Sequence, residues 1–124
     1  MKLSGFELRR ITMPLVSPFR TSFGVEYERD VLLVRAVTAD AEGWGECVAM
    51  SEPLYSGEYV DGAAEVIRRF LVPAAASLPT ADAHAVEPAF ARLKGHPMAK
   101  AAVQTALLDA QLRAAGLSLG SFLG

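Results

Sequence analysis

The stretch DVLLVRAVTADAEGWGECVAM, residues 30 to 50, decides the fold that this sequence predicts. Residues 30–38 are β-branched and apolar on both faces, which is typical of a middle strand covered on both sides. Residues 39–43 form a plausible turn, and residues 44–50 then return as an antiparallel strand. The chain is therefore expected to contain an antiparallel pair of strands at this point.

A third strand is expected on the N-terminal side, over residues 2–13 (KLSGFELRRITM), where apolar residues alternate imperfectly with polar ones. Pro14 and Pro18 exclude a central strand in the segment that follows, because proline has no N–H group to donate to a ladder. Residues 17–24 (SPFRTSFG) are thus predicted to be neither strand nor helix, although they carry two phenylalanines. The three strands together make an antiparallel meander.

About three helices are expected after a second irregular stretch, residues 51–58 (SEPLYSGE). Residues 59–71 repeat apolar side chains at helical spacing, and Pro73 is expected to close this helix. A shorter helix is predicted over residues 83–93, with Asp82 as its N-cap. The fold class is therefore α+β.

The last helix, residues 97–115, has the clearest boundaries, because Pro97 suits a first helical turn and Gly116 stands just past the end. Apolar side chains occupy two roughly opposite faces of this helix. One face carries Val103, Leu107, Ala110 and Ala114, and the other carries Ala101, Leu108 and Leu112. Such a helix needs two packing partners, of which the sheet is one. The other is a further helix or a body outside this chain.

Composition and charge describe one globular domain. The chain has 124 residues, 52% of them hydrophobic, and a net charge of -2, which gives no electrostatic reason to expect nucleic acid or an anionic membrane as partner. No apolar run approaches the ~18 residues that span a bilayer. The single cysteine, Cys47, cannot form an internal disulfide, and the N-terminus lacks the apolar stretch of a signal peptide, so we expect a cytoplasmic protein.

No catalytic group of residues is evident from the spacing alone. The stretch GWGE, residues 43–46, begins like a glycine-rich phosphate loop, but it enters a strand and is better explained as a tight turn. His84 and His96 have no Cys or His at metal-ligand spacing, and Cys47 is most simply a small core residue. The glutamates are too dispersed to define a common metal site.

The two irregular stretches carry the candidate binding residues. In a meander, the segments after the first and third strands emerge at the same end of the sheet, so they should be neighbours. Together they offer Phe19, Phe23, Met50, Leu54 and Tyr55, with Arg20 and Ser22 as polar groups. These side chains either form a ligand-binding patch or fold back onto the core of the domain.

Three stretches carry a resemblance to a known family: MPLVSPFRTSFG, GWGECVAMSEPLYSGEY and KGHPMAKAAVQTALLDAQLRAAGLSLGSFLG. Taken together and in this order, they resemble the N-terminal capping domain of the enolase superfamily. More narrowly, they are similar to the o-succinylbenzoate synthase / N-acylamino acid racemase group. The resemblance covers most of the chain.

The resemblance implies an enolase N-terminal domain-like fold that caps a C-terminal (β/α)₈ barrel, expected after residue 124 and not present in this chain. In the family, barrel carboxylates hold a Mg²⁺ that stabilises an enediolate, and two lysines act as acid and base. Those residues have no counterparts here. The segment alone is therefore expected to bind no metal and to be inactive.

The resemblance also implies that the two irregular stretches close over the barrel as specificity loops. Phe19, Phe23, Met50 and Tyr55 would line a pocket for the apolar acyl or aryl group of a small carboxylate substrate, and Arg20 would meet a carboxylate or hold the loop. The expected parent is a homo-oligomeric lyase or isomerase, which dehydrates a succinylbenzoate precursor for menaquinone biosynthesis, racemises N-acylamino acids, or does both. Dipeptide epimerisation, muconate-type cycloisomerisation and a stand-alone interaction module without enzymatic activity remain the alternatives.

Overall fold

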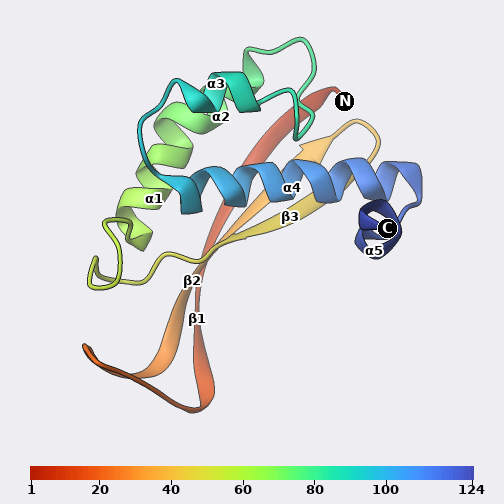
Figure 1. The fold of residues 1–124 in the computed structure, drawn as a ribbon. Coiled ribbons are helices and arrows are strands. Elements are labelled where there is room, and N and C mark those ends of the chain that lie inside the picture. Colours follow the sequence, from red (N-terminus) through yellow and green to blue (C-terminus); the bar gives the residue numbers. More distant parts are fainter.

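The computed structural model describes residues 1–124 and shows a three-stranded antiparallel sheet with helices over one face (Figure 1). The strands are β1 (Leu3–Thr21), β2 (Gly24–Thr38) and β3 (Glu42–Cys47), in the order β1-β2-β3. The helical elements are α1 (Val60–Val66), a π-helical turn η1 (Ile67–Leu71), α2 (Val72–Ala76), α3 (Glu87–Ala91), α4 (Pro97–Ala115) and α5 (Leu119–Leu123). The predicted α+β meander is confirmed. No helix combines the length and the apolar character that crossing a membrane requires.

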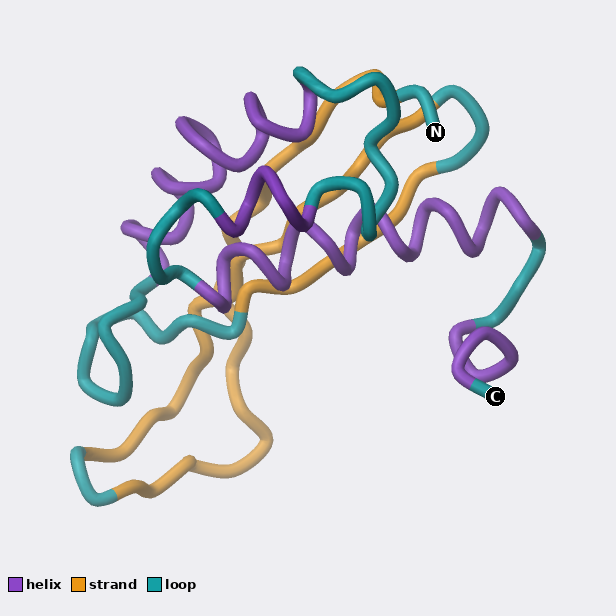
Figure 2. The backbone as a smooth tube through the Cα atoms, turned by 45° about the horizontal axis from the view of Figure 1, so that its top comes forward, coloured by secondary structure: helices purple, strands orange, loops and turns teal.

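Strands β1 and β2 form a long hairpin that extends beyond the helices (Figure 2). The prediction that residues 17–24 are irregular is wrong, because most of that segment lies in β1 and the turn of the hairpin. The register shifts between Pro14 and Phe19, and pairing then resumes to the hairpin turn. Strand β1 can contain these prolines because it lies at the edge of the sheet and pairs only with β2. Their missing N–H groups therefore interrupt one ladder at most, at the register shift.

Strand β2 lies in the middle of the sheet, as predicted, but it is covered by helices on one face only. Leu32, Val34 and Ala36 are buried beneath the helices, whereas the alternating Leu33, Arg35 and Val37 are half-buried. On the outer face the guanidinium of Arg35 donates to Glu7, at 2.9 Å, and to Glu42. Charged side chains of the three strands thus cover part of the outer face of β2, where the apolar sequence predicted a second layer of packing.

The first helix does not end at Pro73. It runs from α1 through the π turn of η1 into α2 and ends at Ala76. Proline in an α-helix loses one hydrogen bond, and its ring collides with the carbonyl four residues earlier. The wider turn of η1 ends at Leu71, two residues before Pro73, and accommodates the proline without ending the helix.

The second predicted helix, residues 83–93, is shorter in the structure, where α3 begins only at Glu87. Pro88 lies in the first turn of α3, the one place in a helix where a missing N–H is harmless. Asp82 is not an N-cap, because its carboxylate accepts a hydrogen bond from the amino group of Met1 at 2.7 Å. Asp82 therefore fixes the N-terminus of the chain.

Helix α4 has the predicted bounds, and Gly116 closes it in the left-handed conformation with a φ of 69°. The short helix α5 was not predicted. The buried side of α4 differs from the predicted pair of faces, since Ala114 and Ala101 are both exposed. The buried residues of α4 are Ala99, Ala102, Val103, Ala106, Leu107, Ala110 and Leu112.

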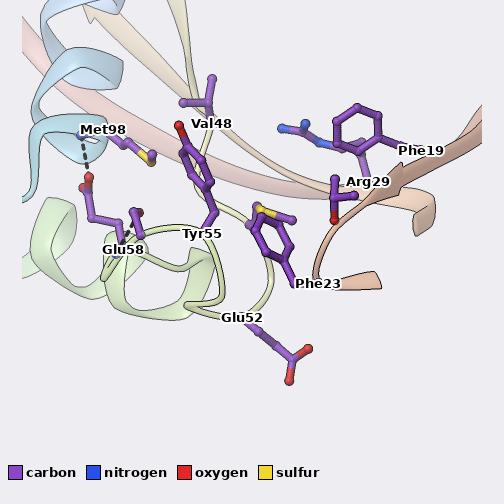
Figure 3. A pocket seen from close by; sticks show the side chains of 11 residues that line it. Phe19, Phe23, Arg29, Val48, Glu52, Tyr55, Glu58 and Met98 are labelled. Carbon is purple, nitrogen blue, oxygen red and sulfur yellow. Dashed lines mark hydrogen bonds between the residues drawn. The ribbon is translucent and has the colours of Figure 1, made fainter. Parts of the chain in front are cut away.

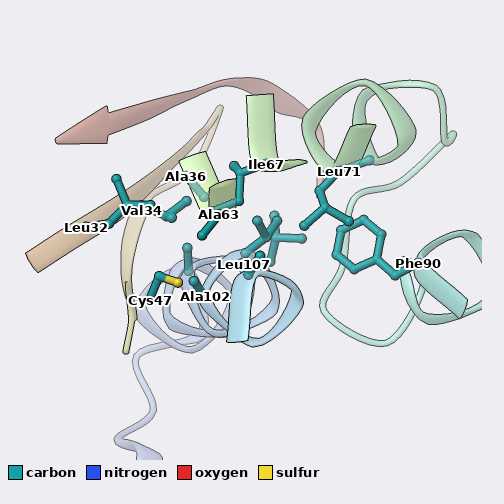
Figure 4. Packing of buried hydrophobic residues seen from close by; sticks show 14 of the residues in the cluster. Leu32, Val34, Ala36, Cys47, Ala63, Ile67, Leu71, Phe90, Ala102 and Leu107 are labelled. Carbon is teal, nitrogen blue, oxygen red and sulfur yellow. The ribbon is translucent and has the colours of Figure 1, made fainter. Parts of the chain in front are cut away.

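The core lies between the sheet and helices α1 and α4, and it also includes Leu71 of η1 and Phe90 of α3 (Figure 4). Gly43 and Gly45 both lie inside β3, so the last strand begins before the predicted residue 44 and ends before residue 50, and Gly43 is not part of the turn. The backbone of α4 passes so close over both glycines that no side chain would fit. Alanines on α4 face these glycines, which brings helix and sheet backbones together.

Candidate functional site

A cavity of about 310 Å³ lies between the β1–β2 hairpin and the segment that follows β3 (Figure 3). The hairpin contributes Phe19, Thr21, Phe23 and Arg29. The segment after β3 contributes Val48, Met50, Glu52, Tyr55, Ser56 and Glu58, and Met98 comes from the first turn of α4. Most of these side chains are apolar or aromatic, which suits a ligand with an apolar body.

Four of the sequence-predicted residues, Phe19, Phe23, Met50 and Tyr55, line this one cavity. The rings of Phe23 and Tyr55 lie 6.3 Å apart between centroids, at an angle of 51°. Such a tilted pair is a favourable aromatic contact, and it joins the hairpin to the segment after β3. Phe19 is 55% exposed and Tyr55 is 71% exposed, so both rings lie at the surface and outside the core.

Arg20 and Leu54, which the sequence grouped with these residues, do not line the cavity. Arg20 pairs with Val25 in the hairpin ladder. Because successive side chains of a strand point to opposite faces, Arg20 lies on the face opposite to Phe19 and Thr21. A segment without regular structure would have no such alternation, so the prediction of an irregular segment could not separate Arg20 from Phe19.

Sequence reasoning missed Arg29, Val48 and Met98 as cavity residues. Arg29 could have been found from the alternation of β2, had the strand been extended to Gly24. Met98 carries no local signal, since only the packing of α4 against the end of the sheet brings it to the cavity. Val48 directly follows the end of β3.

Glu58 lines the cavity and also caps helix α4. Its two carboxylate oxygens accept hydrogen bonds from the backbone N–H groups of Met98, at 2.9 Å, and Ala99, at 3.1 Å. The residue that precedes the helix, His96, provides no side-chain cap. The negative charge of Glu58 thus satisfies two free amides at the positive end of the helix and positions Met98 beside the cavity.

An ion-pair network fixes the base of the hairpin. The guanidinium of Arg10 on β1 donates to Asp30 on β2, at 2.9 and 2.5 Å, and to Asp61 in the first turn of α1. Ser51 donates to Asp30 at 3.4 Å. The hydrogen bond from Arg10 holds the pKa of Asp30 below its usual value. This network ties the hairpin to the segment after β3, which are the two sides of the cavity, and also to helix α1.

The chain supplies no metal site and no evident nucleophile. No group of three or more His, Cys, Asp or Glu side chains could hold a metal ion, and the family resemblance implies Mg²⁺ ligands in the barrel rather than among these residues. Cys47 is buried, and burial raises the pKa of its thiol, which disfavours the thiolate. The Nδ1 atom of His84 lies 3.3 Å from a carboxylate oxygen of Glu87. Neither His84 nor His96 lines the cavity. The lining of the cavity is thus mostly apolar, with Arg29, Glu52 and Glu58 as its charged residues.

The sequence is similar to a known protein family and to individual proteins. Residues 6–124 match the family described as mandelate racemase / muconate lactonizing enzyme, N-terminal domain. All 124 residues are 56% identical to an N-succinylamino acid racemase of an Amycolatopsis species, covering 34% of that protein. A stretch of 118 residues, 94% of the chain, is 37% identical to an o-succinylbenzoate synthase of Geobacillus stearothermophilus and covers 32% of that protein.

A solved structure shares the fold over the whole chain. A member of the enolase superfamily from Listeria innocua superposes with a TM-score of 0.93 at 29% identity, over 100% of this chain and 34% of that one. The chain therefore spans about a third of the length of the relatives it matches.

Proposed function

Because the chain belongs to the mandelate racemase / muconate lactonizing enzyme family of the enolase superfamily, we propose that it is the substrate-specificity cap of its parent protein. The parent, meaning the full-length protein that contains this domain, is proposed to be an o-succinylbenzoate synthase, an N-acylamino acid racemase, or both. The observation that carries the proposal is the cavity in which Phe19, Phe23, Met50 and Tyr55 meet from two separate segments.

The cap binds and orients the substrate, and the remaining two thirds of the parent supplies the chemistry. We propose that this remainder is a (β/α)₈ barrel that packs against the cap and holds a Mg²⁺ ion, which stabilises negative charge as a proton leaves the substrate carbon. In the cap, the aromatic rings would contact the apolar acyl or aryl part of the substrate and keep water away from it. The Arg10 network would hold the hairpin in place while they do so.

The alternative activities involve substrates that would need different side chains around them. A dipeptide carries polar amide and amino groups, whereas Phe19, Phe23 and Tyr55 offer mostly apolar surface, so the lining favours a bulky apolar group. The identity to an N-succinylamino acid racemase supports racemisation over muconate-type cycloisomerisation. A stand-alone interaction module has less support, because matches that cover only 32–34% of each relative suggest a longer parent. We also propose that the parent is a cytoplasmic homo-oligomer.

The test is an assay of the purified parent, with and without Mg²⁺, on a panel of substrates. The panel contains the dehydration precursor of o-succinylbenzoate, N-succinylamino acids, a dipeptide and a muconate. We expect metal-dependent turnover of one or both of the first two, and no turnover by residues 1–124 alone. Turnover confined to the dipeptide or the muconate would contradict the proposal.

A further inference from the structure

Arg29 is the one cationic residue that lines the cavity. Its side chain is half-buried, and Figure 3 shows its guanidinium reaching toward the middle of the cavity, beside the ring of Phe19. Other arginines of the sheet are held by carboxylates: Arg10 by Asp30 and Asp61, and Arg35 by Glu7 and Glu42.

No side chain of this domain forms an ion pair with Arg29. Its sequence neighbour Asp30 points to the other face of β2, where Arg10 and Ser51 contact it. Across the cavity, both oxygens of Glu58 accept backbone hydrogen bonds from helix α4. The carboxylate of Glu52 is exposed, and it points away from the cavity in Figure 3. The guanidinium therefore keeps its donor groups available to a ligand.

We propose that Arg29 binds the terminal carboxylate of a succinyl group and thereby selects succinyl substrates over uncharged acyl substrates. The inference rests on the proposed function and names the ligand chemistry of the same cavity. The two relatives described above act on or form molecules with this group, as their names, N-succinylamino acid racemase and o-succinylbenzoate synthase, state. A succinyl chain has an apolar stem, which suits the aromatic lining, and a carboxylate at its end, which suits a guanidinium.

The selection follows from the cost of burying an unpaired charge. A succinyl carboxylate would replace the water lost from Arg29 with charged hydrogen bonds, whereas an uncharged acyl group would cover the guanidinium without giving it a partner. A hydrogen bond to a charged group contributes enough to change binding by about ten- to a hundredfold. Arg29 therefore acts as a specificity residue, and it takes no part in proton transfer.

The test compares two substrates of the parent enzyme that differ in one group. An N-succinylamino acid and the N-pentanoyl derivative of the same amino acid have acyl chains of similar length, but only the first ends in a carboxylate. In Arg29→Met, the ratio of the two kcat/KM values, succinyl over pentanoyl, should fall by about ten- to a hundredfold, mainly through KM. Arg29→Gln, which also removes the charge, should show a comparable loss, and Arg29→Lys should retain more of the ratio.

The matched control is Arg68→Met, which removes the same charge from an exposed position of η1 outside the cavity and should leave the ratio unchanged. An unchanged ratio in both Arg29→Met and Arg29→Gln would overturn the assignment, and so would an equal loss of activity on both substrates. In a parent that turns over only the succinylbenzoate precursor, the KM for that precursor replaces the ratio: it should rise by about ten- to a hundredfold in Arg29→Met but not in Arg68→Met, and an unchanged KM in Arg29→Met would overturn the assignment. A wild-type enzyme that turns over neither N-acylamino acids nor the succinylbenzoate precursor would refute the proposed function itself, and the ligand assigned to Arg29 with it.

Discussion

Gly45 lies directly beneath Ala102: a β-carbon on Gly45 would be 2.0 Å from the carbonyl oxygen of Ala102, so helix α4 rests on the bare backbone of strand β3. The same holds one pleat away, where a β-carbon on Gly43 would be 2.2 Å from the backbone nitrogen of Ala110. The N-terminal end of α4 carries Met98 to the cavity, so this close contact also places part of the site.

Gly45→Ala should destabilise the domain strongly, because the added methyl group meets helix backbone that cannot move aside. Overpacking a core typically costs about 1–3 kcal/mol, and we expect a loss of at least about 3 kcal/mol here. Urea unfolding of the full-length protein, followed by circular dichroism, measures this change. Gly57→Ala is the control, since nothing lies within 4 Å of that position. Equal unfolding midpoints for the two variants would contradict the prediction.

Glu58→Ala should loosen the first turn of α4, because the N–H groups of Met98 and Ala99 lose their acceptors. Loss of a helix cap typically costs about 1 kcal/mol, up to about 2. Hydrogen exchange at these two amides should accelerate in Glu58→Ala. Glu58→Gln should show a smaller effect, because its amide oxygen can still accept a hydrogen bond. The assignment fails if exchange at both amides is as slow in Glu58→Ala as in the wild type.

Asp30 should make the stability of the domain depend on pH. The hydrogen bond from Arg10 lowers the pKa of Asp30 in the folded state below its ordinary value of 3.8. The resulting stabilisation is complete above the unfolded-state pKa and is lost as the pH falls through the lowered folded-state pKa. Asp30→Asn should therefore lower the Tm most above about pH 4, and the difference from wild type should shrink in more acidic solution.

Thermal unfolding between pH 7 and pH 2 measures this effect. Asp40→Asn serves as the control, because Asp40 lies in an exposed bend and forms no ion pair, so its Tm should follow the wild type throughout. A constant difference between Asp30→Asn and wild type across this range would show that the Arg10–Asp30 pair does not contribute in the expected way.

Phe23→Ala should weaken the binding of substrates with a bulky apolar acyl or aryl group. Phe23 contacts the ring of Tyr55 at the mouth of the cavity, and removing it exposes the ligand to water. Losing part of this apolar contact should raise KM about tenfold in the parent enzyme, while the affinity for Mg²⁺ stays the same. Tyr27→Ala provides the control, because Tyr27 is 67% exposed on β2 and does not line the cavity. Equal kinetics in both variants would remove Phe23 from the binding surface.

Much of the fold could be predicted from local patterns. The order of strands and helices, the middle position of β2 and both ends of α4 follow from apolar periodicity, Pro97 and Gly116. The errors arise at other prolines and at glycines. Pro14, Pro18 and Pro73 were expected to interrupt structure, yet an edge position and a π turn accommodate them. The local sequence shows that a proline removes a backbone hydrogen bond. Whether the strand or helix continues past the proline depends on the elements packed beside it.

The candidate site was predictable in part. Phe19, Phe23, Met50 and Tyr55 were chosen because a meander brings two segments together at one end of the sheet, and they do line one cavity. Arg20 was predicted as a polar group of the same segment and from the family resemblance, but strand alternation places it on the opposite face. Arg29 precedes the predicted strand of residues 30–38, and the local pattern does not show that β2 begins at Gly24.

The sequence by itself determined the fold class, the family and the aromatic residues of the cavity, because each depends on local apolar patterns or on motifs that stand together in the chain. The tertiary structure alone decided that Gly43 and Gly45 serve close packing, that Glu58 caps a helix 40 residues further on, and that Arg29 faces the cavity. These are relations between backbone positions far apart in sequence. They arise only once helix α4 packs against β3 and the twisted hairpin sets which side of each strand faces the site.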